Sequence, residues 1–237
     1  MEWGEFLAAL APMGVTPSDR QREQLQLYSD MLREYNERFN LTAIVLESEV
    51  WRKHFLDSLS ALLVLPHRAK GIDIGSGAGF PGIPLAIVCE EMHFVLLDSL
   101  KKRVGFLQEV ITKVGLQTRV SVLHGRAEDV ARQSLYREKF DFAISRGVAK
   151  LVVLCELSLP FVREGGFFVA MKGPRAPLEI EEAKHAVRLL GGGKMSMVAW
   201  FLPGGEEGRL LVVVPKVGST PLCFPRQAGL PEKKPLL

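Results

Sequence analysis

The 237-residue chain has no long hydrophobic run and only three cysteines, and both features limit the class of protein to which it can belong. No apolar stretch approaches the ~18 residues that a membrane-spanning helix needs, and the first residues do not show the basic and then apolar pattern of a secretory signal. Cys89, Cys155 and Cys223 stand far apart and form no CxxC pair, so neither a disulfide framework nor a zinc site is indicated. We therefore expect a cytoplasmic protein that binds no metal and does not contact a membrane.

Net charge is also small, at +3, but the C-terminal segment carries an excess of basic residues. A basic segment that also contains several prolines suits binding to a phosphate backbone or an extended strap along the core. Solvated disorder is equally compatible with this composition, so all three interpretations stay open. The basic residues are Lys216, Arg226, Lys233 and Lys234, against Glu232 alone, and the prolines are Pro221, Pro225, Pro231 and Pro235.

The rest of the chain divides into a helical extension (residues 1–68), an α/β core (69–217) and the tail (218–237). Thr16-Pro17-Ser18-Asp19 predicts a helix start with Thr16 as the N-cap. The core alternates strands and helices and closes with two strands around Pro203-Gly204-Gly205, which predicts a seven-stranded, mostly parallel sheet with a terminal hairpin. The predicted strands are 70–74, 94–98, 119–124, 140–145, 166–171, 194–200 and 209–215, and the predicted helices are 81–91, 100–114, 127–133, 150–162 and 178–189.

A glycine-rich loop, GIDIGSGAGFPGIP over residues 71–84, follows the first predicted strand. Glycine permits positive φ and close approach of the backbone to a ligand, so a strand–loop–helix corner of this kind is typical of nucleotide binding. Counted from the strand end, Asp73 precedes Gly75, Gly77 and Gly79 in the methyltransferase register, where the acid can meet the amine of a methionine moiety. A glycine loop alone is weak evidence, and a plain tight turn remains an alternative.

A second acidic residue, Asp98, follows the glycine loop at a spacing that suits ribose binding. Asp98 ends the buried run HFVLLD, roughly twenty residues beyond the glycine loop, where an acid accepts hydrogen bonds from a ribose diol. Asp98 also suits the N-cap of the helix that begins near Leu100, and the two roles are compatible. Together with the loop, this spacing predicts that a nucleoside lies over the strand ends.

Seven segments along the chain form an ordered set: NLTAI (40–44), HFLDSL (54–59), DIGSGAGFPGIPLAI (73–87), LLDSLKKRVGFL (96–107), HGRAED (124–129), FDFAISRGVA (140–149) and MKGP (171–174). With the KKPL ending, they resemble the bacterial RsmG/GidB family, methyltransferases that place 7-methylguanosine in 16S ribosomal RNA. The resemblance covers nearly the whole chain. It implies a Rossmann-like class I methyltransferase core, S-adenosyl-L-methionine as methyl donor, S-adenosyl-L-homocysteine as product, and 16S ribosomal RNA or the small ribosomal subunit as partner. We expect a monomer.

The resemblance also implies cofactor contacts at Gly75, Phe80, Ala127, Glu128 and Arg146. From the residues alone, Phe80 can cover the donor or pack under the sheet, and Glu128 can contact adenine or complement a helix dipole. Gly147 replaces the alanine common in relatives, so we expect a looser helix start beside Arg146. The full predicted cofactor set is Asp73, Gly75, Gly77, Gly79, Phe80, Asp98, Ser99, Ala127, Glu128 and Arg146.

The predicted chemistry requires no general base. The N7 atom of guanine carries a free lone pair, so alignment and exclusion of water can supply most of the rate, and orientation alone contributes roughly 7–11 kcal/mol. The fourth strand ends in Ser145-Arg146 rather than in the Asn/Asp-Pro-Pro-aromatic motif used on exocyclic amines, and no Pro-Cys or Thr-Cys is present for a covalent pyrimidine adduct. Cys155 is expected in the core. His54, Asp57 and Ser58 are too close in sequence for a hydrolase triad, and we expect packing or a substrate-edge role for them.

Basic residues near the predicted strand ends indicate RNA binding, although each alone suits a solvated helix surface. Methylation of another RNA, a small molecule or a protein is the alternative within the same class. A nicotinamide-dependent oxidoreductase and a non-catalytic RNA-binding protein are the alternatives outside it. The predicted RNA contacts are Lys101, Lys102, Arg103, Arg126, Lys172 and Arg175.

Overall fold

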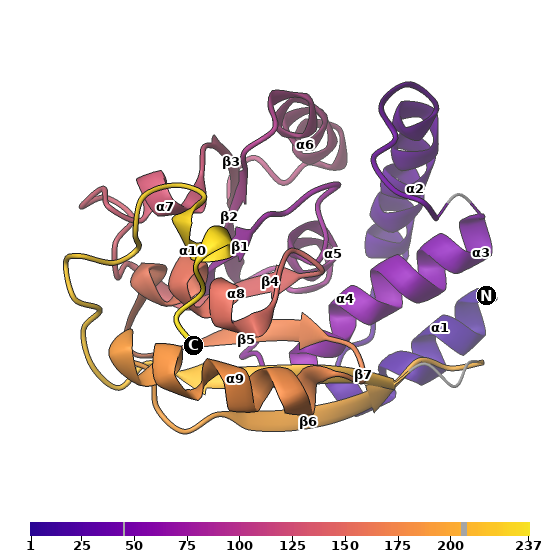
Figure 1. The fold of residues 1–237 in the computed structure, drawn as a ribbon. Helices are drawn as coiled ribbons and strands as arrows, with labels where there is room; N and C mark the ends of the chain where they lie inside the picture. Colours follow the sequence, from indigo (N-terminus) through magenta and orange to yellow (C-terminus); the bar gives the residue numbers. More distant parts are fainter. Residues whose placement is uncertain (45, 205–207) are drawn as a thin grey trace.

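The computed structural model describes residues 1–44, 46–204 and 208–237, which form one seven-stranded sheet with helices on both faces (Figure 1). The strand order is β3-β2-β1-β4-β5-β7-β6. Strands β1 to β5 pair in parallel, and β7 is antiparallel to both β5 and β6, which confirms the predicted α/β class. The strands are β1 (Ala69–Ile74), β2 (Met92–Asp98), β3 (Val120–His124), β4 (Phe140–Arg146), β5 (Val162–Lys172), β6 (Ser196–Phe201) and β7 (Gly208–Pro215).

Helices connect the parallel strands at the predicted places, and their observed bounds differ from the predicted bounds mainly at the helix ends. The short α7 ends at Val130, before the predicted end at residue 133, and α8 passes into a 3-10 turn at Leu159–Phe161. In the predicted hairpin turn, Gly204 has positive φ, and Gly205 lies outside the described residues. The core helices are α5 (Gly82–Val88), α6 (Lys101–Val114), α7 (Ala127–Val130), α8 (Leu151–Ser158) and α9 (Ala176–Leu189).

Alternate residues of the central strands enter two separate hydrophobic cores. In β5, Phe168 and Ala170 belong to the core formed with α8 and α9, whereas Val169 and Met171 belong to the core formed with α5, α6 and the N-terminal helices. This alternation is the period of two of a β-strand whose faces are both covered. Because helices cover both faces, the loops at the carboxyl ends of the strands remain as the place for a ligand.

The N-terminal extension is helical, as predicted, and packs beside the sheet (Figure 1). The predicted N-cap Thr16 is wrong, because Ser18 caps α2: its Oγ accepts from the N–H of Gln21, and the Gln21 side chain accepts from the N–H of Ser18. This capping box satisfies two backbone donors at once. The elements are α1 (Trp3–Leu10), α2 (Asp19–Phe39), α3 (Glu47–Glu49), a π-helical segment (Val50–Leu56), α4 (Asp57–Leu59) and a 3-10 turn (Ser60–Leu63).

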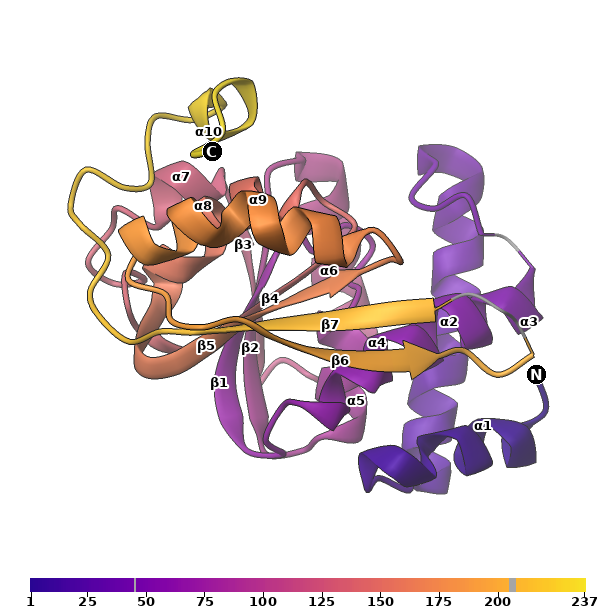
Figure 2. The same ribbon diagram turned by 60° about the horizontal axis from the view of Figure 1, so that its bottom comes forward.

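The tail is ordered. We call residues 218–237 the C-terminal strap; it runs from the end of β7 past α7 to the short helix α10 (Leu230–Lys233) beside α8 (Figures 1 and 2). Lys216, at its root, is buried and lies 2.8 Å from Glu138, and Arg226 lies 2.6 Å from the buried Glu156. The segment is therefore an extended strap rather than a solvated, disordered one, and two of the four basic residues form ion pairs with the core. Binding of this segment to a phosphate backbone stays a prediction.

Among the described residues, no helix combines the length and apolar character that crossing a membrane requires. Within the same part of the chain, no group of three or more His, Cys, Asp or Glu side chains is placed to hold a metal ion. Cys155 lies fully buried in α8, as predicted, and burial raises the pKa of its thiol to about 12. That thiol is therefore a core group and not a nucleophile.

Candidate active site

The glycine loop between β1 and α5 passes over the carboxyl ends of β1, β2 and β4. Gly75, Gly77 and Gly79 all have positive φ. At Gly75, φ is 71° and a Cβ would lie 2.8 Å from the side chain of Val148, so a larger residue would be strained and would clash. The N–H of Gly77 donates to Asp98 at 2.9 Å, which joins the loop to the end of β2.

Asp73 lies under this loop with one carboxylate oxygen lacking a partner. The residue is fully buried at the end of β1, and its Oδ2 accepts from the N–H of Gly82 at 3.0 Å. The buried Oδ1 has no hydrogen-bond partner among the described residues. Burial raises the pKa of Asp73 to about 7, against the lowering effect of the Gly82 hydrogen bond. A cationic amine bound at Oδ1 would satisfy this oxygen and favour the ionised carboxylate.

Backbone N–H groups donate hydrogen bonds to both carboxylate oxygens of Asp98. Its Oδ2 accepts from Gly77, and its Oδ1 accepts from the N–H of Leu100 at 2.9 Å at the start of α6. Arg103 lies 3.5 Å from Oδ2. The carboxylate is therefore fixed over the strand ends, and each oxygen keeps a second lone pair that can accept from a hydroxyl. The contact to a ribose remains a prediction.

Two adjoining pockets lie at this loop and share Gly75, Asp98, Ser99 and Val148. Eight of the ten predicted cofactor residues line one pocket or both, and Asp73 and Gly79 do not. The strand-end pocket is lined by Ile74, Gly75, Leu97, Asp98, Ser99, Gly125, Arg126, Ala127, Glu128, Val148, Ala149, Val153, Leu157, Gly229, Pro231 and Glu232. The loop pocket is lined by Leu41, Thr42, His54, Gly75, Ser76, Gly77, Ala78, Phe80, Asp98, Ser99, Leu100, Arg103, Arg146, Gly147 and Val148.

Arg146, His54 and Phe80 form one stacked unit in the loop pocket. The ring of His54 stacks on Phe80 with centroids 4.3 Å apart, and the Arg146 guanidinium lies 5.0 Å from the Phe80 centroid. Burial lowers the pKa of His54 to about 3, so the imidazole is neutral at physiological pH. The Nη2 of Arg146 donates to Nδ1 of His54 at 3.1 Å, and the opposite ring nitrogen lies 2.8 Å from the hydroxyl of Thr42. Phe80 therefore both packs against the N-terminal helices and lines the pocket.

Asp57 connects Arg146 to a third pocket. Its Oδ2 accepts from Nη1 of Arg146 at 2.9 Å, and its Oδ1 lies 3.3 Å from Nε of Arg209 on β7. The basic pocket, as we name it, has more cationic than anionic side chains in its lining. It is lined by Lys53, His54, Asp57, Arg146, Gly147, Met171, Lys172, Gly173, Arg209, Leu210 and Leu211.

Sequence reasoning did not identify the partners of Arg146 or the role of Tyr28. Tyr28 of α2 is fully buried, and its hydroxyl donates to the carbonyl of Ala78 in the glycine loop at 2.5 Å. The substrate-edge role expected of His54 and Asp57 agrees with their positions beside Arg146. The position of Tyr28 within α2 gives no sign in the sequence of which loop its side chain contacts.

The strand that ends at Arg146 is followed by a turn and not directly by a helix. Gly147 has φ of 66°, and α8 begins at Leu151, so the expected loosening of a helix start at Gly147 is wrong. Alanine at this position would adopt a left-handed conformation that costs roughly 1–2 kcal/mol. Glycine is therefore the residue that this turn geometry favours.

The predicted RNA contacts do not all lie free on the surface. Lys101, Lys102, Arg126 and Arg175 are exposed, and the amine of Lys102 donates to the carbonyl of Phe39. Arg103 is paired with Asp98, and the mostly buried Lys172 lies 2.7 Å from Glu179 of α9. The role of all six in binding RNA stays a prediction.

Residues 21–203 match the family model of the rRNA small subunit methyltransferase G (GidB). The chain belongs to this family. A Ribosomal RNA small subunit methyltransferase G of Lactobacillus helveticus is 46% identical over 236 residues, which cover 98% of each chain. The protein of the same name from Moorella thermoacetica is 46% identical over 225 residues, which cover 94% of this chain and 93% of that one. Membership confirms the predicted family and the predicted enzyme class, a methyltransferase.

Solved structures of low sequence identity share the fold. A predicted O-methyltransferase of Agrobacterium tumefaciens has a TM-score of 0.55 and 20% identity over 69% of this chain and 80% of that one. TYW2 of M. jannaschii, solved in complex with AdoMet, has a TM-score of 0.50 and 15% identity over 64% of this chain and 69% of that one. These likenesses support the Rossmann-like methyltransferase fold that the family implies.

Proposed function

We propose that this protein transfers the methyl group of S-adenosyl-L-methionine to N7 of a specific guanine in 16S ribosomal RNA in the cytoplasm. The observation that carries the substrate is the family match over residues 21–203, because pocket geometry alone does not distinguish one purine substrate from another. The relatives named above act, by their names, on the RNA of the small ribosomal subunit. The arrangement of the pockets agrees with a nucleoside-containing donor and a base that meet at the glycine loop.

The residues present fit the donor. Asp98, which lines both pockets, suits the two ribose hydroxyls, whereas the fully buried Asp73 lines neither pocket and would meet the amine of the methionine moiety through its orphaned Oδ1 only after the glycine loop shifts. Ala127 and Glu128 line the strand-end pocket, where the adenine would lie beyond the ribose. With this order along the strand ends, the methionine moiety would lie nearest the loop pocket, and the loop pocket would receive the target base.

The loop pocket suits a reaction without proton removal. When bound, S-adenosyl-L-methionine would supply an electrophilic methyl group on a sulfonium. The lone pair of guanine N7, which is already free, would form the new bond to the methyl carbon as the S–CH3 bond breaks and S-adenosyl-L-homocysteine leaves. His54 is neutral and both of its ring nitrogens have partners, so it is not placed as a general base. The methylated purine gains a positive charge, which the guanidinium of Arg146 would repel. Asp57, which pairs with Arg146, offsets that guanidinium charge. The residues of this site therefore orient the substrates and exclude water.

We propose that the RNA binds at the basic pocket and at the exposed cations around the strand ends. Arg146 belongs to both the loop pocket and the basic pocket, so a phosphate held in the basic pocket would lie next to the target base. Phosphate contacts of this kind position the RNA, whereas the base itself is recognised in the pocket. We propose a monomeric enzyme, which light scattering of the free protein tests.

A methyl-transfer assay tests the proposed function. Purified protein receives tritiated donor with naked 16S RNA, an assembly intermediate or the mature small subunit, and methylated guanines are mapped by reductive strand scission. We expect label at one guanine N7 and no label with Arg146→Ala. Label entering another component of a cell extract, with none in 16S RNA, would support the alternative methyltransferase substrates instead. Thermal stabilisation by NADH and not by the methyl donor would support an oxidoreductase.

A further inference from the structure

The C-terminal strap supplies three residues of the strand-end pocket. Gly229, Pro231 and Glu232 line this pocket together with predicted cofactor residues that follow β1, end β2 and begin α7. The backbone N–H of Gly229 donates to Oε1 of Glu128 at 2.8 Å. Glu128, for which the sequence left adenine contact and complementing a helix dipole both open, thus holds the strap at the pocket through Oε1.

An ion pair between Arg226 and the buried Glu156 fixes the strap just before the pocket. The guanidinium of Arg226 contacts both oxygens of Glu156, at 2.9 and 2.6 Å, and the backbone N–H of Arg226 donates to the same carboxylate at 2.8 Å. Glu156 is 1% exposed and lies on α8 between Val153 and Leu157, which themselves line the pocket. Bidentate arginine–carboxylate pairs hold a fixed geometry, so this contact sets where the following residues lie.

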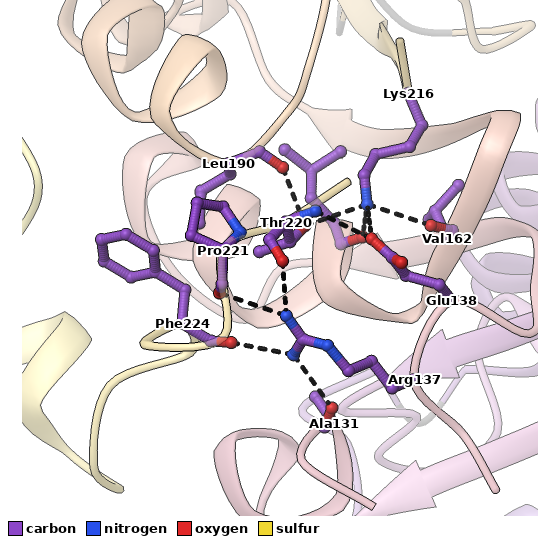
Figure 3. A network of polar contacts seen from close by, with 10 residues as sticks. Ala131, Arg137, Glu138, Val162, Leu190, Lys216, Thr220, Pro221 and Phe224 are labelled. Carbon is purple, nitrogen blue, oxygen red and sulfur yellow. Dashed lines mark hydrogen bonds and ion pairs between the residues drawn. The ribbon is translucent and has the colours of Figure 1, made fainter. Parts of the chain in front are cut away.

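The root of the strap is fastened separately (Figure 3). Arg137 donates to the carbonyls of Thr220, Pro221 and Phe224 at 2.7 to 3.1 Å. The buried amine of Lys216 contacts Glu138, the Thr220 hydroxyl and two carbonyls of the core. These contacts lie before Arg226 in the chain, so they hold the root independently of the segment that lines the pocket.

We propose that the C-terminal strap is a wall of the methyl-donor site, and that Gly229 to Glu232 cover the adenosine half of the donor. The inference rests on the proposed function, because that function supplies the ligand of the strand-end pocket. If the donor contacts the strap, then the docked strap must strengthen donor binding, and donor binding must stabilise the docked strap by the same factor. A strap that only packs on the core would show neither effect.

Isothermal calorimetry with S-adenosyl-L-homocysteine tests the first half of this coupling on the full-length protein. Arg226→Ala removes the anchor without changing a residue that lines the pocket, and we expect the dissociation constant to rise at least tenfold. Glu156→Gln serves as the second variant if Arg226→Ala does not fold. Leu222→Ala, at a strap residue that is 83% exposed, is the matched control and should bind as the wild type does.

Hydrogen exchange of the wild type tests the second half. Saturating S-adenosyl-L-homocysteine should slow exchange in residues 226–234 and leave residues 219–224 unchanged. Affinity within twofold of wild type in folded Arg226→Ala and Glu156→Gln, together with unchanged exchange, would overturn the proposal while leaving the enzyme's function intact. Failure of the wild type to bind S-adenosyl-L-homocysteine at all would instead overturn the proposed function, so the two failures are distinguishable.

Discussion

The guanidinium of Arg146, at the end of β4, lies 2.9 Å from the carboxylate of Asp57, which comes 89 positions earlier on α4. Both side chains are largely buried, with exposed fractions of 15% and 6%. The pair ties the N-terminal extension to the loop pocket, because Asp57 belongs to the extension and Arg146 to the sheet. The helical extension is therefore part of the candidate active site rather than a separate module.

Asp57→Asn should damage both stability and methyl transfer. Removing one partner of a buried ion pair leaves an uncompensated charge, which typically costs about 3–5 kcal/mol. We expect the free energy of unfolding to fall by about 3 kcal/mol in urea titrations, and methyl transfer measured well below the unfolding midpoint to fall at least tenfold. Asp30→Asn is the control, because Asp30 pairs with Arg33 on the exposed face of α2 and should change neither quantity measurably. Wild-type activity in Asp57→Asn would show that the pair serves the fold alone.

Donor binding should weaken below neutral pH through Asp73. Burial raises the pKa of this carboxyl to about 7 in the free protein, and a cationic amine binds its ionised form. Below pH 7 the donor must displace a proton, so its dissociation constant should rise, approaching tenfold per pH unit. Calorimetry in buffers of different ionisation enthalpy should detect proton release at pH 6. Asp73→Asn should bind weakly with a flat pH profile, and an equally steep profile in that variant would remove Asp73 from the amine site.

His54 should make the protein less stable as pH falls. Its pKa is about 3 in the folded protein, against 6.5 for an unperturbed histidine, so the unfolded chain binds the extra proton between these values. That proton uptake favours unfolding, and the contribution between pH 7 and pH 5 amounts to about 2 kcal/mol. Urea titrations should therefore show a greater loss for wild type than for His54→Gln over this range. The effect of Asp73, which has the opposite sign, is present in both proteins and cancels in the difference. Parallel pH profiles would mean that His54 titrates normally.

The sheet and its crossover helices could be predicted because their signals are local. Buried parallel strands are short apolar runs, and each ends near a glycine, acid or arginine that marks the carboxyl edge. The helix start was less certain, because Thr16 and Ser18 both suit an N-cap and only Ser18 is followed at the third position by Gln21. The strands and the location of the site could thus be predicted from the sequence.

The long-range partners of the site could not be predicted in this way. Arg146 meets His54 and Asp57, and Glu128 meets Gly229, across roughly 90 to 100 positions, and no periodic pattern specifies such pairs. Composition left the tail undecided because paired and solvated cations look alike in a sequence. The family resemblance supplied the function, whereas the local motifs supplied only a nucleoside site.

Phe80→Ala should lower stability as well as methyl transfer. Phe80 is 6% exposed and packs against Tyr28 and Phe55 as well as His54. Truncating a buried phenylalanine typically costs about 3–5 kcal/mol, because the neighbouring groups do not fill the cavity. We expect a lower thermal midpoint and slower methyl transfer, and Phe80→Leu should restore most of the stability. If Phe80→Leu also restores full activity, the aromatic ring is required for packing and not for contact with the substrates.

Lys101→Ala should weaken RNA binding in a way that depends on salt, whereas Lys113→Ala should not. Both lysines are exposed on α6, but Lys101 begins the helix beside Asp98 at the strand ends and Lys113 lies in its last turn, far along the same helix. A phosphate contact releases a counterion, so its loss lowers the slope of log affinity against log salt by roughly 0.7–0.9. Binding of 16S RNA fragments between roughly 50 and 200 mM salt, the range over which such contacts are resolved, measures this slope. Because the two substitutions remove the same charge from the same helix, equal slopes would mean that RNA responds to net charge alone and does not dock at the strand ends.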